Sequence, residues 1–338
     1  MIAAKQTPAL LLISLTIALV GCINDRSQDY AVLANDGIYS AAINESGKIA
    51  IIGSMNNGAS LWDNQSKNRL FKWHHNPEQD EAIHLVSITD NGELAATVSN
   101  NTSISIWNAS HGFHIRSFLA PSKINQLALL NQNNAMIIAL ENHTSLMIDI
   151  PSGSTLAVFN HKGRVNSVDL NANTNIAITG SDDHSAKIWN LSKPLHSKRL
   201  AHNGPVNLVK LSPDGSLALT VARYDKVIVW NTNNASLFGE IPLSKSHLKR
   251  GVVFTAAKFS NDNRWLLTGT TGGVVQLWDL VAFKLQQQWT MPKRYFIKPN
   301  QSTVLAVAFT SKGHYSAITT NGLFHQFKYA MAASIMPP

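Results

Sequence analysis

From residue 30 onward, apolar and polar residues alternate in short runs separated by turns that contain Gly, Asn and Asp. Alternation with a period of two predicts β-strands with distinct faces, and these three residue types tolerate the left-handed backbone of tight hairpins. The clearest unit is residues 168–190, VDLNANTNIAITGSDDHSAKIWN, which contains three short strands and ends on an aromatic residue. The pattern therefore predicts a chain built of successive β-hairpins.

The same unit recurs seven times along the chain. The other copies occupy residues 41–63, 86–108, 127–149, 209–231, 257–279 and 307–329. Their large apolar anchor residues, spaced by 41 to 49 positions, are Trp62, Trp107, Ile148, Trp189, Trp230, Trp278 and Phe327. A period of roughly 40–50 residues is that of one four-stranded propeller blade. A fourth, outer strand is expected after each anchor, as at residues 69–73, 156–159 and 286–289.

The seventh copy has no segment left for its outer strand. Residues 30–34 align with the outer-strand segment that begins at Arg199, so we expect them to complete the last blade and to cover its open edge. The sequence thus predicts an all-β fold, a seven-bladed β-propeller of four-stranded antiparallel blades over residues 30–329. Residues 330–338 are expected to form a C-terminal tail.

Five of the copies end in Trp-Asp or Trp-Asn, at Trp62-Asp63, Trp107-Asn108, Trp189-Asn190, Trp230-Asn231 and Trp278-Asp279. In this respect the repeats resemble those of the WD-repeat family over residues 30–329. The resemblance implies a buried hydrogen-bonded tetrad in blade four, formed by His161, Thr179, Asp183 and Trp189. Because such a chain satisfies its buried polar groups, we interpret it as structural and not as a catalytic His–Asp dyad.

The other blades keep less of the tetrad. Blade five retains His202, Thr220 and Trp230 but has Tyr224 where the Asp is expected, and other blades have Asn56, Asn101 or Gly272 at that position. The resemblance therefore implies a degenerate set of WD repeats.

The first residues indicate export. Lys5 precedes an apolar run, Ala9–Val20, that is too short to span a bilayer as a helix. Leu19-Val20-Gly21-Cys22 resembles the bacterial lipobox, which implies cleavage before Cys22, the only cysteine of the chain, and its acylation. The alternative is a plain signal peptide or signal anchor. We expect residues 1–21 to be the signal peptide and 22–29 the lipidated cysteine and a polar tether. Ile23, where Asp would favour retention in the inner membrane, favours the outer membrane facing the periplasm.

Composition and motifs point away from several function classes. The formal net charge is +8 but charged residues make up only 14%, and the absence of long Lys/Arg runs argues against nucleic-acid binding. We find no phosphate-binding loop and no nucleophile elbow, so we predict no catalytic residues and no cofactor. His74 and His75, with Glu78, Asp80 and Glu81, could bind a divalent metal. Their spacing fits no common metal motif, and we interpret the loop as a solvated polar one.

Loop lengths suggest where partners bind. Three loops that lead from an outer strand into the next blade are long, at residues 74–82, 244–253 and 291–303. In a propeller such loops share one face with the turns between second and third strands, and we call it the loop face. The last two bring together a basic and aromatic set, Lys245, Lys249, Arg250, Lys293, Arg294, Tyr295, Phe296 and Ile297. Such grouping is typical of a protein-binding hot spot. The alternative is that Phe296 and Ile297 pack under their loop and the charges only solubilise it.

These observations favour a monomeric, membrane-anchored scaffold or assembly factor in the periplasm that binds other proteins, among them ones with acidic surfaces, through its loop face. A second hypothesis is a sensor or carrier that binds a small ligand or metal in the central channel or near His74 and His75. A degenerate propeller enzyme is the third.

Overall fold

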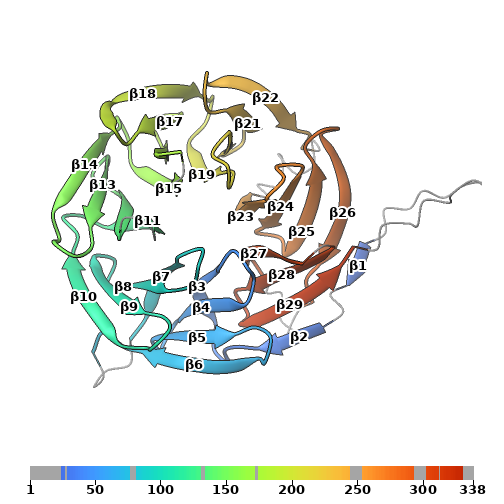
Figure 1. The fold of residues 1–338 in the computed structure, drawn as a ribbon. Helices are drawn as coiled ribbons and strands as arrows, with labels where there is room; N and C mark the ends of the chain where they lie inside the picture. Colours follow the sequence, from blue (N-terminus) through green and yellow to red (C-terminus); the bar gives the residue numbers. More distant parts are fainter. Residues whose placement is uncertain are drawn as a thin grey trace, which may run out of the picture.

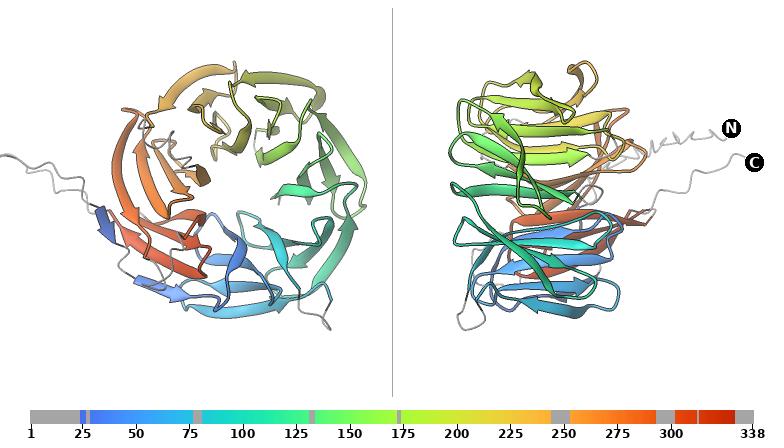
Figure 2. Two further views of the ribbon diagram at one scale, coloured as in Figure 1. Left: turned by 180° about the vertical axis from the view of Figure 1, so that it is seen from behind. Right: turned by 60° about the vertical axis from the view of Figure 1, so that its left-hand side comes forward.

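The computed structural model describes residues 24–26, 29–76, 81–130, 134–171, 174–243, 253–292, 302–311 and 313–329. Its sheets are arranged as seven blades around a central axis, as Figure 1 shows. The predicted all-β, seven-bladed propeller of four-stranded antiparallel blades is confirmed. Figure 2 shows the ring from behind and from a more lateral direction.

Each blade runs outward from an inner strand at the axis. The inner strands are β3 (Ile38–Ile43), β7 (Ile83–Ile88), β11 (Ile124–Leu130), β15 (Val165–Asn171), β19 (Val206–Leu211), β23 (Phe254–Phe259) and β27 (Val304–Ser311). The second strands are β4 (Ile49–Ser54), β8 (Leu94–Ser99), β12 (Ala135–Leu140), β16 (Ile176–Ser181), β20 (Leu217–Ala222), β24 (Trp265–Thr270) and β28 (His314–Thr319).

The outer half of each blade completes the sheet. The third strands are β5 (Ala59–Asp63), β9 (Ser103–Asn108), β13 (Thr144–Asp149), β17 (Ser185–Asn190), β21 (Val227–Asn231), β25 (Val274–Asp279) and β29 (Leu323–Lys328). The outer strands are β6 (Asn68–Trp73), β10 (His114–Leu119), β14 (Thr155–Asn160), β18 (Lys193–Ala201), β22 (Ser236–Ile241), β26 (Lys284–Thr290) and β2 (Asp29–Val32).

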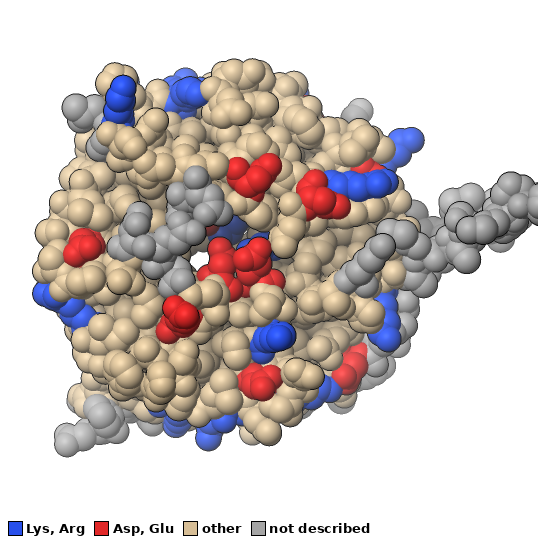
Figure 3. All heavy atoms as spheres, in the orientation of Figure 1, with Lys and Arg blue, Asp and Glu red and all other residues tan. Residues whose placement is uncertain are grey.

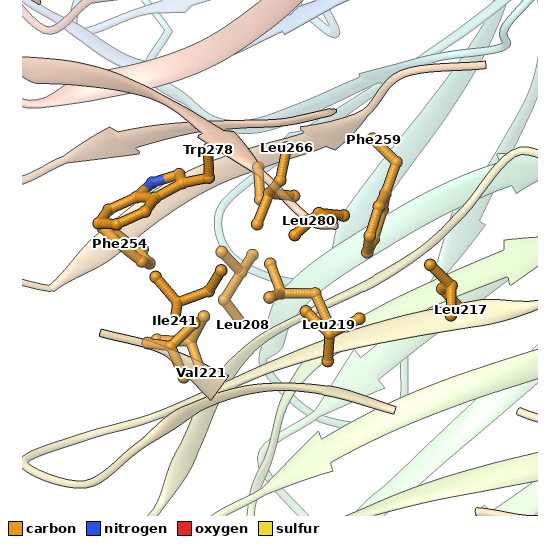
Figure 4. Close-up of a cluster of buried hydrophobic side chains, with 13 residues drawn as sticks. Leu208, Leu217, Leu219, Val221, Ile241, Phe254, Phe259, Leu266, Trp278 and Leu280 are labelled. Carbon is orange, nitrogen blue, oxygen red and sulfur yellow. The ribbon is translucent and has the colours of Figure 1, made fainter. Parts of the chain in front are cut away.

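The core lies between neighbouring blades. Strands β12 and β20 are buried at every residue, because each second strand is covered on both faces by adjacent sheets. Figure 4 shows the cluster between blades five and six, where Leu219 and Ile241 of one blade meet Phe254 and Trp278 of the next. Burial of large apolar side chains of this kind, at about 1.5–3 kcal/mol each, is what holds the ring together.

The N-terminal segment closes the ring as expected from the sequence. Strand β2 pairs antiparallel with β29, from Asp29 opposite Gln326 to Val32 opposite Leu323. The next residue, Leu33, is buried and donates its backbone N–H to the Gly322 carbonyl at 2.8 Å. The edge of the last blade is therefore covered by the chain itself.

A second N-terminal pairing was not foreseen. Residues within the segment interpreted as a tether form strand β1 (Asn24–Arg26), which lies parallel to β26 on the outer edge of blade six. Blade six thereby becomes a five-stranded sheet. The chain therefore contacts blade six first and blade seven immediately afterwards.

Candidate functional site

In blade four the structure brings the four tetrad side chains into one hydrogen-bonded chain. His161 Nδ1 lies 2.9 Å from Asp183 Oδ2, and His161 Nε2 lies 2.6 Å from Thr179 Oγ1. The Trp189 indole N–H donates to Thr179 Oγ1 at 2.8 Å. Because the carboxylate can only accept, Nδ1 carries the histidine proton and Nε2 accepts from the threonine hydroxyl. Every donor in the chain thus has an acceptor.

The electrostatics of the tetrad agree with this proton arrangement. Burial lowers the pKa of His161, whose side chain is fully inaccessible, although Asp183 opposes the shift. Burial alone would raise the pKa of Asp183, but hydrogen bonds from Ser185, the Lys162 N–H and His161 outweigh it and lower the pKa to about 2. Near neutral pH the pair is therefore a neutral imidazole beside a carboxylate.

Blade five corrects one prediction. Its tetrad does not lack a carboxylate, although Tyr224 occupies the expected position of the aspartate. The neighbouring Asp225 supplies the carboxylate, with Oδ2 3.5 Å from His202 Nδ1. His202 Nε2 and the Trp230 indole both contact Thr220 Oγ1, at 2.8 and 2.7 Å. Relative to blade four, the aspartate of blade five lies one position later in the turn. The reason is that the left-handed residue of this turn, Tyr224 (φ 57°), comes before the aspartate. In blade four the left-handed residue follows Asp183.

Blade two corrects another prediction, because His75 does not lie in a solvated loop. Its Nε2 is 2.7 Å from Thr97 Oγ1, which also accepts from the Trp107 indole at 2.9 Å. His75 Nδ1 is 3.1 Å from Ser99 Oγ, and Glu81 supplies the nearby carboxylate, with Oε1 3.9 Å from Nδ1. Burial lowers the pKa of His75, and Glu81 opposes the shift. His75, from a long loop, thus occupies the position that His161, from a short loop, occupies in blade four.

The two aspartates should differ in what they contribute to stability. Asp183→Asn replaces a carboxylate at normal hydrogen-bond distance from its histidine, and we expect a loss of about 1–2 kcal/mol in the free energy of unfolding. Asp225→Asn, at the longer separation, should cost less than about 1 kcal/mol. Urea unfolding followed by tryptophan fluorescence measures both. Equal losses would contradict the difference inferred from the two distances.

The turns between second and third strands share a face with the loops that enter each blade. Asp182 donates its backbone N–H to the Arg164 carbonyl at 2.9 Å, and Arg223 donates to the Pro205 carbonyl at 2.8 Å. In blades four and five these hydrogen bonds join the turn between the second and third strands to the loop that enters the blade. The loop face inferred from the sequence therefore exists in the described part of the chain.

Tyr224 lies on this face, in the turn between β20 and β21. Its side chain is 71% exposed, on a left-handed backbone that bulky residues rarely adopt. The Arg223 guanidinium lies 5.7 Å from the centre of the Tyr224 ring. Tyrosine and arginine are both enriched among the residues that contribute most to protein-binding interfaces.

Ion pairs lie on the same side of blades three to five. Arg164 Nε pairs with Asp182 at 2.7 Å, and Arg164 Nη1 lies 3.7 Å from Glu141 of blade three. In blade five, Lys226 pairs with Glu240 at 2.8 Å. Paired charges are thus present on this face in blades three to five, and a polar rim of this kind accompanies aromatic residues in protein interfaces.

The partner-binding residues expected from the sequence lie outside the described residues. These are Lys245, Lys249, Arg250, Lys293, Arg294, Tyr295, Phe296 and Ile297, and Cys22 also lies outside them. The sequence did not identify Tyr224 as a binding residue. It indicated only that Tyr224 stands where the aspartate of the blade-five tetrad is expected. The signal available was an aromatic residue after Arg223 at a turn position that favours Gly, Asn or Asp.

The central channel holds two ion pairs. Lys210 Nζ lies 3.0 Å from Asp169 Oδ1 on the neighbouring blade. Lys258 Nζ lies 3.3 Å from Asp90 Oδ1, and this pair joins blade six to blade two across the axis. Figure 3 shows acidic side chains around the opening of the channel. Within the described ranges no group of three or more His, Cys, Asp or Glu side chains is placed to hold a metal ion.

Fold and tetrad together define a propeller of the WD type. The family model for the WD domain, G-beta repeat, matches residues 153–190, which include the outer strand of blade three and the first three strands of blade four, and residues 242–279, which end with the third strand of blade six. The chain is thus a seven-bladed β-propeller with repeats that match the WD family model, and propellers of that family are commonly non-catalytic scaffolds for protein interactions. A comparison with curated proteins gave no match. In the part of the chain that the structure describes, no helix is long and apolar enough to cross a membrane.

Proposed function

We propose that this protein is a membrane-anchored scaffold or assembly factor that faces the periplasm and binds another protein through its loop face. The observation that carries the proposal is the exposed Tyr224 ring beneath the Arg223 guanidinium. The family tendency toward protein interaction supports it. The lipobox-like Leu19–Cys22 sequence supports the anchor and the compartment.

The described tyrosine and the predicted loop residues belong to one binding surface in this proposal. The turn with Tyr224 leads into β21, whose Val227 pairs with Ile241 at the end of β22. Two residues later, Leu243 is the last described position before the basic segment that contains Lys245, Lys249 and Arg250. The strand that follows Tyr224 and the strand that precedes the cationic segment are therefore paired neighbours in blade five. A partner with an acidic surface would complement that cationic segment.

A cross-linking experiment tests this function. We expect Tyr224→Asn to weaken partner capture from cross-linked membranes by about 30-fold, since hot-spot aromatic residues contribute about 2 kcal/mol or more. Asn accepts the left-handed backbone, so the turn itself should remain folded. Tagged wild-type and variant proteins are isolated, and co-purifying proteins are quantified by mass spectrometry.

Phe113→Ser provides the matched control. Phe113 is 56% exposed and lies in the turn before β10, on the face opposite the loop face. A protein lost with Tyr224→Asn and with Tyr295→Ala/Phe296→Ala, but retained with Phe113→Ser, supports the proposal. Retention of the same partner by Tyr224→Asn, or its loss in the control, argues against the loop face as the binding surface.

A further inference from the structure

The first described strand fixes where the N-terminal end of the chain meets the propeller. Asn24 lies opposite Gln288 and Arg26 opposite Thr290, so β1 runs alongside the second half of β26. Figure 1 shows β1 on the outer rim of the ring, away from the central channel. The chain therefore reaches the molecule at its rim, on blade six.

The distance from this strand to the proposed anchor is very short. Cys22 precedes Asn24 by two residues, and a fully extended chain spans at most about 7 Å over that length. Acyl chains on Cys22 would thus bring the bilayer surface to the outer edge of blade six. A tether of this length leaves little freedom for the ring to turn another side toward the membrane.

The strands around that point carry the charge expected of a surface that faces anionic lipid. Going around the rim, β26 of blade six, whose outer edge β1 partly covers, is followed by β2 of blade seven and β6 of blade one. They contain the exposed cations Lys284, Arg69 and Lys72. Their only carboxylate is Asp29, which is already paired with Lys67 at 2.6 Å. The net charge of these outer strands is therefore positive.

Apolar and aromatic side chains accompany these cations. Tyr30 is 58% exposed on β2, and Val32, Leu70 and Leu285 are also exposed on the same three strands. Tyrosine is enriched at membrane–water interfaces, where its ring contacts lipid and its hydroxyl contacts water. Exposed apolar side chains between lysines and arginines suit the boundary between headgroups and acyl chains.

We propose that the outer strands β26, β2 and β6 form a membrane-facing rim that lies on an anionic bilayer. The ring then stands on its edge, and its loop face stays open to a protein partner. This inference rests on the proposed lipid anchor at Cys22. Beyond the anchor, the inference specifies the surface of the propeller that faces the membrane.

Depth-dependent fluorescence quenching tests the orientation. The chain has no cysteine besides Cys22, so a new cysteine can be labelled selectively in the lipidated, full-length mature protein. Leu70→Cys and Leu285→Cys place a fluorophore on the proposed rim, and Leu156→Cys places it on β14 of blade three, on the far side of the ring. The three leucines are matched in exposure, at 43%, 38% and 51%. The vesicles contain phosphatidylethanolamine, phosphatidylglycerol and a lipid with a quencher on its headgroup.

We expect at least threefold stronger quenching at Leu70→Cys and Leu285→Cys than at Leu156→Cys. Inserting about ten Gly and Ser residues between Cys22 and Asn24 should reduce that ratio at least twofold, because the longer tether lets the ring turn. Arg69→Glu/Lys72→Glu should reduce it as well, since each cation near an anionic surface contributes about fivefold in binding. Lys193→Glu/Arg199→Glu, on β18 across the ring, is the matched charge control and should leave it unchanged.

The outcomes separate this inference from the anchor on which it rests. Protein that floats with the vesicles but is quenched equally at all three positions overturns the rim orientation and leaves the anchor intact. Protein that does not float with the vesicles overturns the anchor, and the orientation with it.

Discussion

Thr179→Val should lower the free energy of unfolding by about 2–5 kcal/mol, although valine closely matches threonine in shape. The Thr179 hydroxyl accepts from the Trp189 indole N–H and binds His161 Nε2, at 2.8 and 2.6 Å. All three side chains are inaccessible or nearly so, so water cannot replace the lost partner. Leaving a buried polar group unsatisfied costs about 1–3 kcal/mol, and this substitution leaves two.

Thr155→Val is the matched control, because Thr155 begins the outer strand β14 and is exposed. It should change stability by less than about 0.5 kcal/mol. The midpoint of urea unfolding, followed by tryptophan fluorescence and circular dichroism, measures both variants. A loss of less than about 1 kcal/mol for Thr179→Val would mean that the tetrad contributes little and that apolar packing between blades accounts for the stability of this region.

The architecture was predictable because it repeats. A single alternating strand is ambiguous, but seven copies of one pattern that end on Trp or another large apolar residue leave few folds open. Ring closure followed from the same logic, since the last copy lacked an outer strand and residues 30–34 matched one. The structure places that strand at Asp29–Val32.

Details of the tetrads were not predictable, because they depend on backbone conformation in turns. Alignment by residue number assigned the aspartate position of blade five to Tyr224. The turn instead places its left-handed residue at Tyr224 and brings Asp225 toward His202. His75 was missed for a related reason, since the long loop of blade two hides its spacing to Thr97.

Strand β1 illustrates a further limit of sequence reasoning. Asn24–Arg26 is polar and too short to show alternation, so it was interpreted as part of a tether. Its pairing with β26 uses backbone groups, which every sequence offers, and depends on an edge that only the folded ring creates. The location of the N-terminal end on the rim, and with it the proposed orientation on a membrane, could come only from the structure.

Acid should destabilise the propeller between about pH 6.5 and 4, and His325 should account for about 3 kcal/mol of the loss. His325 is fully buried on β29, with Nε2 3.1 Å from Thr319 Oγ1. Burial lowers its pKa from 6.5 to about 4. Below pH 6.5 the unfolded chain binds a proton at this histidine that the folded protein does not, so stability falls as pH falls, and the contribution of His325 levels off below its folded pKa. Each pH unit in this window is worth about 1.4 kcal/mol per group.

His325→Gln removes the titrating group and retains a side-chain N–H that can donate to Thr319 Oγ1, whose own hydroxyl donates to Asn321 Oδ1 at 2.6 Å. We therefore expect a shallower fall in stability for this variant between pH 6.5 and 4, measured by urea unfolding at a series of pH values. His196→Gln, an exposed position on β18, is the control for loss of a histidine. A residual slope should persist, because burial also lowers the pKa of His75, His161 and His202. An unchanged slope in His325→Gln would show that these three tetrad histidines, and not His325, link the stability of the ring to pH.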